Sequence, residues 1–331
     1  MAIDSFRDLL RLAHGFELAK VFFTANDLDL FSRLGEGREP FDLAFELGVD
    51  GRALGLLLNA LTAMGLLEKV GDRFRNAPVA NEFLVRNQNY RGSIFRHIHH
   101  CWEAWTELPQ VLRSGHPVAP KEADILGARE EWTRDFIRGM DDVTRELAPQ
   151  VARQLDFGGA RVLLDVGGGP GTYAAAFLAA HPGLQEVRLF DLPGALAVGR
   201  ERLAARGVLD KVRLIEGDFC VNELDSGVDV VWISQVFHSR DAEGCRMLVE
   251  KAWRALNPGG LLAVHEFLLD EGKTTPLSAA LFAVHMLVMT EGGRTYSGGE
   301  ISAWMEEVGF VCPETRRVSE ETAVVLARKP G

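Results

Sequence analysis

The sequence predicts an α/β protein with a doubly wound, mostly parallel, Rossmann-like sheet and an N-terminal, mainly helical winged-helix domain. Apolar strand patterns and helical patterns alternate from residue 160 to the end of the chain, as in parallel sheets with right-handed crossovers. A glycine-rich turn at 167–171 joins the first of these strands to an alanine-rich helix. Helix, turn, helix and hairpin patterns follow one another within the first 90 residues, in the order of a winged helix.

The N-terminal elements predict a dimerisation domain over residues 1–90. Apolar residues recur at helical spacing over 16–34, two shorter helices are expected at 40–47 and 52–64, and 66–75 has the pattern of a hairpin. A winged helix could bind DNA, but residues 1–90 contain 13 acidic and 10 basic side chains and no basic stripe. The apolar surface of the second helix therefore favours packing on a partner chain over nucleic-acid binding.

Composition and charge argue against several classes of function. The net charge is −11, which argues against binding through phosphate neutralisation. The N-terminus has no signal-peptide pattern, and the longest uncharged stretch, 274–290, is too short to span a membrane, so we expect a cytoplasmic protein with no membrane contact. The four cysteines are scattered and predict neither a disulfide framework nor a zinc site.

Residues 91–155 are expected to form a helical linker and pocket segment, with breaks near 115–117 and at Gly127. The segment is rich in aromatic residues and methionine. His97, His99 and His100 lie close together in sequence, but no acid or cysteine stands at ligand spacing, so we expect no metal. Residues 156–331 are expected to form the ligand-binding domain.

Strand and helix patterns alternate along residues 156–331. Strands are expected at 161–166, 186–190, 212–216, 228–233, 261–267 and 322–327, and helices at 173–180, 195–206, 242–256 and 300–308. A sharp turn is expected at 257–260, and Ser297 and Glu300 form a capping-box pattern.

Ligands of such sheets bind at the carboxyl ends of the strands. Asp191 follows the second strand and could accept hydrogen bonds from ribose hydroxyls, while Asp218 and Phe219 follow the third and suit a purine. His238 follows the fourth strand, and Glu266 ends the fifth. The glycine spacing is G-x-G-x-G, which departs from the dinucleotide fingerprint. The pattern predicts a nucleoside that carries a carboxylate or phosphate at the glycines.

These motifs together resemble one known family. Leu-Asp-Val-Gly-Gly-Gly-Pro-Gly at 164–171, Phe-Asp-Leu-Pro at 190–193, Gly-Asp-Phe at 217–219 and Asn-Pro-Gly-Gly at 257–260 are similar to motifs of the class I S-adenosylmethionine-dependent O-methyltransferases. Members of this family carry an N-terminal winged-helix dimerisation domain, to which residues 22–74 are similar. The resemblance covers nearly the whole chain.

The resemblance implies a role for each matching residue. The methionine part of the cofactor would lie near Gly167, Gly168, Gly169 and Ser234, and its ribose and adenine near Asp191, Leu192, Asp218 and Phe219. His238 stands at the position of the catalytic histidine, and Glu266 at that of the acid that orients it. The acceptor pocket would be lined by Trp132, Phe136, Met140, His285, Met286 and Met289, with His97 or His100 as polar contacts.

The chemistry of such a site is coherent. The sulfonium of the cofactor already activates its methyl group, so the protein has to place the nucleophile and take up its proton. A phenol is mostly protonated at neutral pH, and histidine is the side chain best suited to act as the base. A carboxylate on the far ring nitrogen fixes the tautomer and stabilises the imidazolium that forms.

Four positions depart from the family pattern. The residues after His238 are Ser239 and Arg240, where the family often has Asp-Trp, the second acid of plant members falls on Thr295, and a pocket asparagine of some relatives falls on Thr290. The resemblance therefore predicts a homodimeric O-methyltransferase acting on a largely apolar, aromatic small molecule. It leaves open a C-methyltransferase, a member that binds the cofactor without methylating, and, from a different class, a winged-helix regulator that senses a metabolite.

Overall fold

The computed structural model describes residues 3–118 and 130–331, which form two compact units that divide between His100 and Cys101. The division lies at residue 100 rather than at 90, because α7 (Gly92–His100) packs along α2 (Gly15–Asp27). The Asn26 side chain donates to the carbonyl oxygen of Gly92, and the rings of Phe22 and Phe95 meet edge to face at 4.7 Å. The expected break at Gly127 lies outside the described residues.

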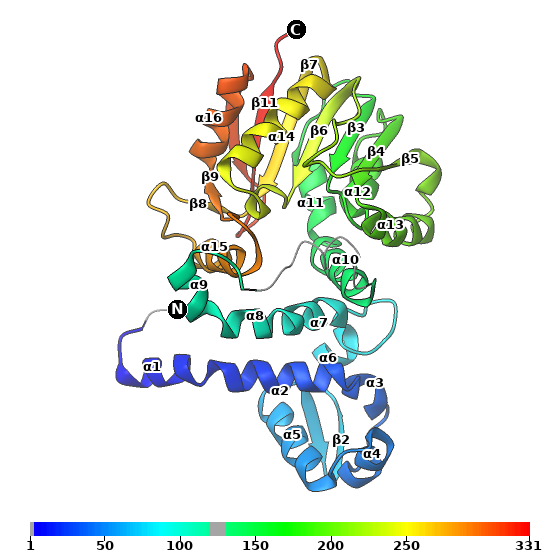
Figure 1. The fold of residues 1–331 in the computed structure, drawn as a ribbon. Helices are drawn as coiled ribbons and strands as arrows, with labels where there is room; N and C mark the ends of the chain where they lie inside the picture. The colour runs from blue at the N-terminus through cyan, green and yellow to red at the C-terminus, as the bar shows by residue number, and fades with distance from the viewer. Residues whose placement is uncertain (1–2, 119–129) are drawn as a thin grey trace. The chain divides into compact units, whose positions relative to one another are not determined.

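The first unit has the expected order of helices and hairpin (Figure 1). Its core is formed by apolar side chains such as Leu30, Phe31 and Leu58. The helix expected over 16–34 is divided in two, because Asp29 adopts a left-handed conformation with φ 51°. The other elements are α1 (Phe6–Ala13), α3 (Leu30–Leu34), α4 (Pro40–Leu47), α5 (Gly51–Ala63), β1 (Leu67–Val70), β2 (Arg73–Asn76) and α6 (Pro78–Phe83).

The second unit is built on a seven-stranded sheet with the order β10-β11-β7-β6-β3-β4-β5. The five strands from β7 to β5 are parallel, and β11 pairs antiparallel with both β7 and β10, so the predicted fold class is confirmed. The strands are β3 (Val162–Val166), β4 (Glu186–Asp191), β5 (Val212–Glu216), β6 (Val228–Ser234), β7 (Leu256–Glu266), β10 (Val311–Arg317) and β11 (Ala323–Arg328), with a separate pair, β8 (Leu268–Leu269) and β9 (Tyr296–Ser297).

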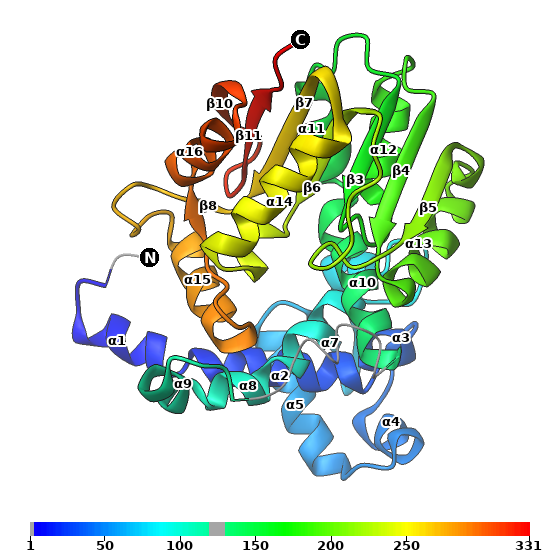
Figure 2. The same ribbon diagram turned by 45° about the horizontal axis from the view of Figure 1, so that its top comes forward.

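Helices cover both faces of this sheet (Figures 1 and 2). Alternate residues of the strands point to opposite faces, so that Leu164 and Leu163 belong to different clusters. Leu164 packs with α14 (Ala242–Ala255) and α16 (Gly298–Val308), and Leu163 with α11 (Leu147–Gln154), α12 (Thr172–Ala180) and α13 (Pro193–Ala205). The remaining helices are α8 (Trp102–Thr106), α9 (Leu108–Ser114), α10 (Glu130–Thr144) and α15 (Leu277–Met289).

Two local predictions have different outcomes. The capping box is confirmed, since the Ser297 side chain accepts from the Glu300 N–H and Glu300 accepts from the Ser297 N–H. The turn at 257–260 does not precede its strand as predicted but forms a bulge within β7, because Leu256 already pairs with Val228. The carboxylate of Asp229 holds the bulge by accepting from the Asn257 amide at 2.8 Å. Within the described residues, no helix combines the length and apolarity that a membrane crossing requires.

Candidate active site

The glycine turn is shaped by tight packing. Gly167 and Gly169 have φ values of 69° and 50°, a region that favours glycine. A Cβ on Gly167 would lie 2.8 Å from Val236 Cγ2 and 3.8 Å from the Phe219 ring, and a Cβ on Gly168 would lie 2.7 Å from Asp165 Cγ. A side chain at Gly167 or Gly168 would therefore clash with the residues packed around the turn.

Asp191 ties the end of β4 to this turn. One carboxylate oxygen accepts from the Gly169 N–H at 2.7 Å, and the other from the Leu192 N–H at 2.7 Å. Each oxygen keeps a lone pair, so a pair of ribose hydroxyls can donate to the same carboxylate. Burial raises the pKa of Asp191 to about 6, against the lowering effect of the two backbone donors.

A second acid, which was not predicted, lies beneath the turn. Asp165 is buried on β3, where burial and the nearby charge of Asp191 raise its pKa to about 8. Its Oδ2 has no hydrogen-bond partner among the described residues. The sequence does contain a signal that could have pointed to Asp165. It is an acid inside the apolar run Val162–Val166, and a strand buried on both faces rarely carries one.

The predicted adenine residues lie next to one another after β5. Asp218 accepts from the Cys220 N–H at 2.7 Å, and its own N–H donates to Asn222. The Phe219 carbonyl accepts from the buried ammonium of Lys251 at 2.7 Å, which holds this loop against the sheet. The Phe219 ring lies beside the glycine turn, so a ligand held by Asp191 at the turn can extend its base toward this ring.

Ser234 is held by a histidine that the sequence analysis did not single out. The Ser234 hydroxyl lies 2.9 Å from Nδ1 of the buried His265, whose Nε2 lies 2.9 Å from the Thr322 hydroxyl. Burial lowers the pKa of His265 to about 4, so its ring stays neutral and bonds to one hydroxyl as a donor and to the other as an acceptor. The Ser234 side chain is thereby fixed at the end of β6.

His238 and Glu266 meet at the carboxyl ends of neighbouring strands. The His238 Nδ1 lies 2.8 Å from Glu266 Oε2, and the His238 backbone N–H donates to Oε1 at 3.3 Å. The Glu266 side chain is 3% exposed and that of His238 12%. Since Nδ1 donates to the carboxylate, the free lone pair of the neutral ring is on Nε2, where it can accept a proton.

Comparison with known proteins decides the family. Residues 121–311 match the O-methyltransferase domain, and residues 10–86 match the O-methyltransferase dimerisation domain.

The chain belongs to the O-methyltransferase family.

Several known methyltransferases are similar to this chain along nearly its whole length. The chain is 32% identical to a 3-hydroxy-5-methyl-1-naphthoate 3-O-methyltransferase of Streptomyces sahachiroi, over 94% of this chain and 90% of that one. It is 30% identical to the tetracenomycin polyketide synthesis 8-O-methyl transferase TcmO of Streptomyces glaucescens, over 98% and 96%. A solved structure of PigF with SAH has a TM-score of 0.91 and 26% identity, covering 98% of this chain and 100% of that chain.

The cofactor of this O-methyltransferase is S-adenosylmethionine, and the protein is a methyltransferase. The residues described above fit this cofactor. The Asp191 carboxylate has lone pairs for the ribose hydroxyls, and the Phe219 ring lies beside the glycine turn, where it can contact the adenine. No charged side chain is needed for a pyrophosphate, which the cofactor lacks.

Helix α15 of this O-methyltransferase places one ring against His238 and a second ring against the first. The Phe282 ring meets His238 edge to face at 4.8 Å and stacks on His285 at 5.6 Å, and His285 Nδ1 accepts from the indole N–H of Trp105 at 3.0 Å. Phe282 was not predicted, although it lies one helical turn before Met286.

The other residues expected at the acceptor pocket lie on three helices. Met286 and Met289 are buried on α15, and Met289 packs with Cys101 and Val288. On α10, Trp132 and Phe136 stack at 6.0 Å, and Met140 follows one turn later. His97 and His100 lie in the last turn of α7, in the first unit, where His99 bonds to Asp27 at 2.6 Å.

Three of the four departures from the family pattern donate hydrogen bonds to backbone carbonyls. Thr295 is buried and donates to the Ala279 carbonyl, Thr290 donates to the Met286 carbonyl, and Ser239 donates to the Val236 carbonyl. Glu266 is accordingly the acid that the described residues place on His238.

Proposed function

We propose that this chain transfers the methyl group of S-adenosylmethionine to a hydroxyl of an aromatic small molecule, with His238 as the general base. The hydrogen bond of 2.8 Å between His238 Nδ1 and Glu266 Oε2 carries the proposal, because it leaves Nε2 to accept the proton of an acceptor hydroxyl. The name of one relative specifies a hydroxynaphthoate and that of another specifies tetracenomycin polyketide synthesis; the hydroxynaphthoate supports an aromatic substrate.

The proposed reaction needs few groups. The cofactor supplies an activated methyl. His238 would accept the phenolic proton as the acceptor oxygen takes the methyl group, whose bond to the cofactor's sulfur breaks to leave S-adenosylhomocysteine, and Glu266 would stabilise the resulting imidazolium. Gly167, Gly168, Gly169, Leu192, Asp218 and Ser234 would bind and orient the cofactor together with Asp191 and Phe219. Aromatic rings and methionines on α10 and α15 would exclude water and hold the flat acceptor in line with the methyl group.

A labelling assay tests the transfer. The full-length protein would be incubated with S-adenosylmethionine carrying a CD₃ group and a panel of phenols that includes 3-hydroxy-2-naphthoate, and the products analysed by mass spectrometry and NMR. We expect the label on a phenolic oxygen. A label on ring carbon or on nitrogen would contradict the proposal, as would binding of the cofactor without transfer to any acceptor.

We also propose that the protein is a homodimer formed through residues 1–90. Helix α1 is amphipathic and has no buried residue, and its apolar side chains are exposed, with Phe6 74% and Leu9 51% accessible. An apolar surface of this kind is typical of an interface, and the match to a dimerisation domain makes a second copy the natural partner. Light scattering on the full chain should give the mass of two copies, and a chain shortened to begin at residue 15 should dissociate more readily.

A further inference from the structure

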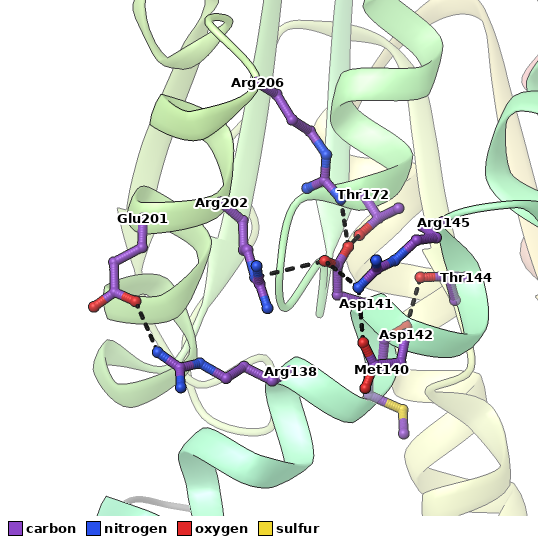
Figure 3. Close-up of polar contacts among 10 residues, drawn as sticks. All are labelled: Arg138, Met140, Asp141, Asp142, Thr144, Arg145, Thr172, Glu201, Arg202 and Arg206. Carbon is purple, nitrogen blue, oxygen red and sulfur yellow. Dashed lines mark hydrogen bonds and ion pairs between the residues drawn. The ribbon is translucent and has the colours of Figure 1, made fainter. Parts of the chain in front are cut away.

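A buried carboxylate ties the pocket helix to the glycine turn. Asp141 on α10 is 2% exposed, and its Oδ1 accepts from the Thr172 hydroxyl at 2.6 Å and from Arg206 at 2.5 Å. Its Oδ2 lies 3.5 Å from Arg202 and 3.6 Å from Arg145. Figure 3 shows these four side chains, which come from α10, α12 and α13 or its C-terminal cap, converging on the one carboxylate.

The position of this cluster links the two halves of the proposed reaction. Thr172 is the first residue of α12 and directly follows the glycine turn. Asp141 follows Met140, one of the expected acceptor-side residues, and lies one turn after Ile137. The Ile137 side chain packs over the turn, since a Cβ on Gly169 would lie 3.9 Å from its Cδ1. Any slide or rotation of α10 would therefore move Met140 relative to the cofactor site.

A contribution to folding stability does not by itself explain why Asp141 is buried among charged partners. Burial opposes ionisation of Asp141, but Thr172 and Arg206 outweigh it and hold its pKa below the usual range. A buried ion pair costs most of its Coulombic gain in desolvation, and an apolar replacement of similar size is often as stable. The arginines line a cavity of about 600 Å³ and remain 22–34% exposed, so water can solvate them when the carboxylate is neutralised.

We propose that Asp141 is a positioning residue that fixes the height and rotation of α10 on the glycine turn, and thereby aligns the acceptor with the methyl donor. This inference rests on the proposed function. Misplacement of a reacting group by about 1 Å can cost on the order of 10²-fold in rate, so a small shift of α10 is sufficient to matter.

A matched control is present on the same two helices. Glu201 of α13 pairs with Arg138 of α10 at 3.4 Å (Figure 3). Arg134 lies equally close to Glu201, and the side chains of all three residues are at least 35% exposed. An exposed pair of this kind contributes little to structure. Glu201→Gln thus breaks an ion pair between α10 and α13 without touching Asp141.

The test compares Asp141→Asn and Thr172→Val with Glu201→Gln in the full-length protein. Asp141→Asn is isosteric and removes the charge, and Thr172→Val removes only the hydroxyl, so that one variant remains informative when the other folds poorly. We expect kcat for the phenolic acceptor to fall about tenfold in both variants, with the SAH dissociation constant within about threefold of wild type. Hydrogen exchange of α10 amides should accelerate in both, and Glu201→Gln should match wild type throughout.

Two results would overturn the inference. A lower melting temperature with unchanged kcat, KM and α10 exchange would make the cluster merely structural, and a loss of SAH affinity in step with kcat would place its effect on the cofactor. If the wild-type protein methylates no phenol, the proposed function fails. In that case, α10 hydrogen exchange in Asp141→Asn and Thr172→Val that matches wild type would separately overturn the positioning role.

Discussion

Acidification should weaken cofactor binding through Asp191. Burial raises the pKa of this carboxyl to about 6, and ribose hydroxyls donate best to its ionised form. Because the folded, unliganded protein holds the proton more tightly than the unfolded chain does, this group lowers the free energy of unfolding as the pH rises from about 4 to about 6. Below pH 6, the cofactor has to displace that proton in order to bind.

The size of the effect follows from the pKa. At pH 5, one unit below it, about one carboxyl in eleven is ionised, whereas nearly all are ionised at pH 7. The dissociation constant of SAH should therefore be roughly tenfold higher at pH 5 than at pH 7, or about 1.4 kcal/mol. Binding at pH 5.5 should release a proton.

Calorimetric titration with SAH measures both quantities. Repeating it in buffers of different ionisation enthalpy reports the proton released on binding. Asp191→Asn should bind more weakly and with no pH dependence over this range, whereas Glu266→Gln should keep the wild-type slope. An affinity in wild type that does not change between pH 5 and 7, or the same slope in Asp191→Asn, would refute the reasoning.

Three further variants test neighbouring contacts. Asp165→Asn should raise the melting temperature relative to wild type by an amount that grows from pH 5 to pH 8. The reason is that burial raises the pKa of Asp165 to about 8, so that its ionisation opposes folding. A difference in melting temperature that does not change with pH would contradict this. Gly168→Ala should cost about 1–3 kcal/mol in chemical denaturation, since its Cβ would lie 2.7 Å from Asp165 Cγ, while Gly159→Ala, which meets nothing within 4 Å, should be neutral. Glu266→Gln should lower kcat at least about tenfold in steady-state assays without weakening SAH binding, and an unchanged kcat would remove its role.

The strand ends were predictable because each is a local pattern. An apolar run followed by glycines or by an acid marks both the strand and what stands at its carboxyl end, and this brought Asp191, His238 and Glu266 to one edge of the sheet. Strand β10 was missed, because Val311–Arg317 contains Pro313 and mostly exposed polar residues, as edge strands do.

Long-range polar contacts were not predictable. Asp141 lies 31 residues from Thr172 and 65 from Arg206, and only the packing of α10 on α12 and α13 brings them together. His265 was passed over for the same reason, since its partners Ser234 and Thr322 are brought to it by strand pairing. Helix and strand periodicity shows which face is buried but does not show which buried polar groups will meet.

The most direct test of the central claim is the turnover of His238→Ala with labelled cofactor and a phenol that wild type methylates. We expect kcat to fall by about 10²-fold, since a positioned general base contributes on that order, while SAH binds as in wild type. The label should still go to oxygen in the residual product. An unchanged kcat would show that the His238–Glu266 pair is not the base of this reaction.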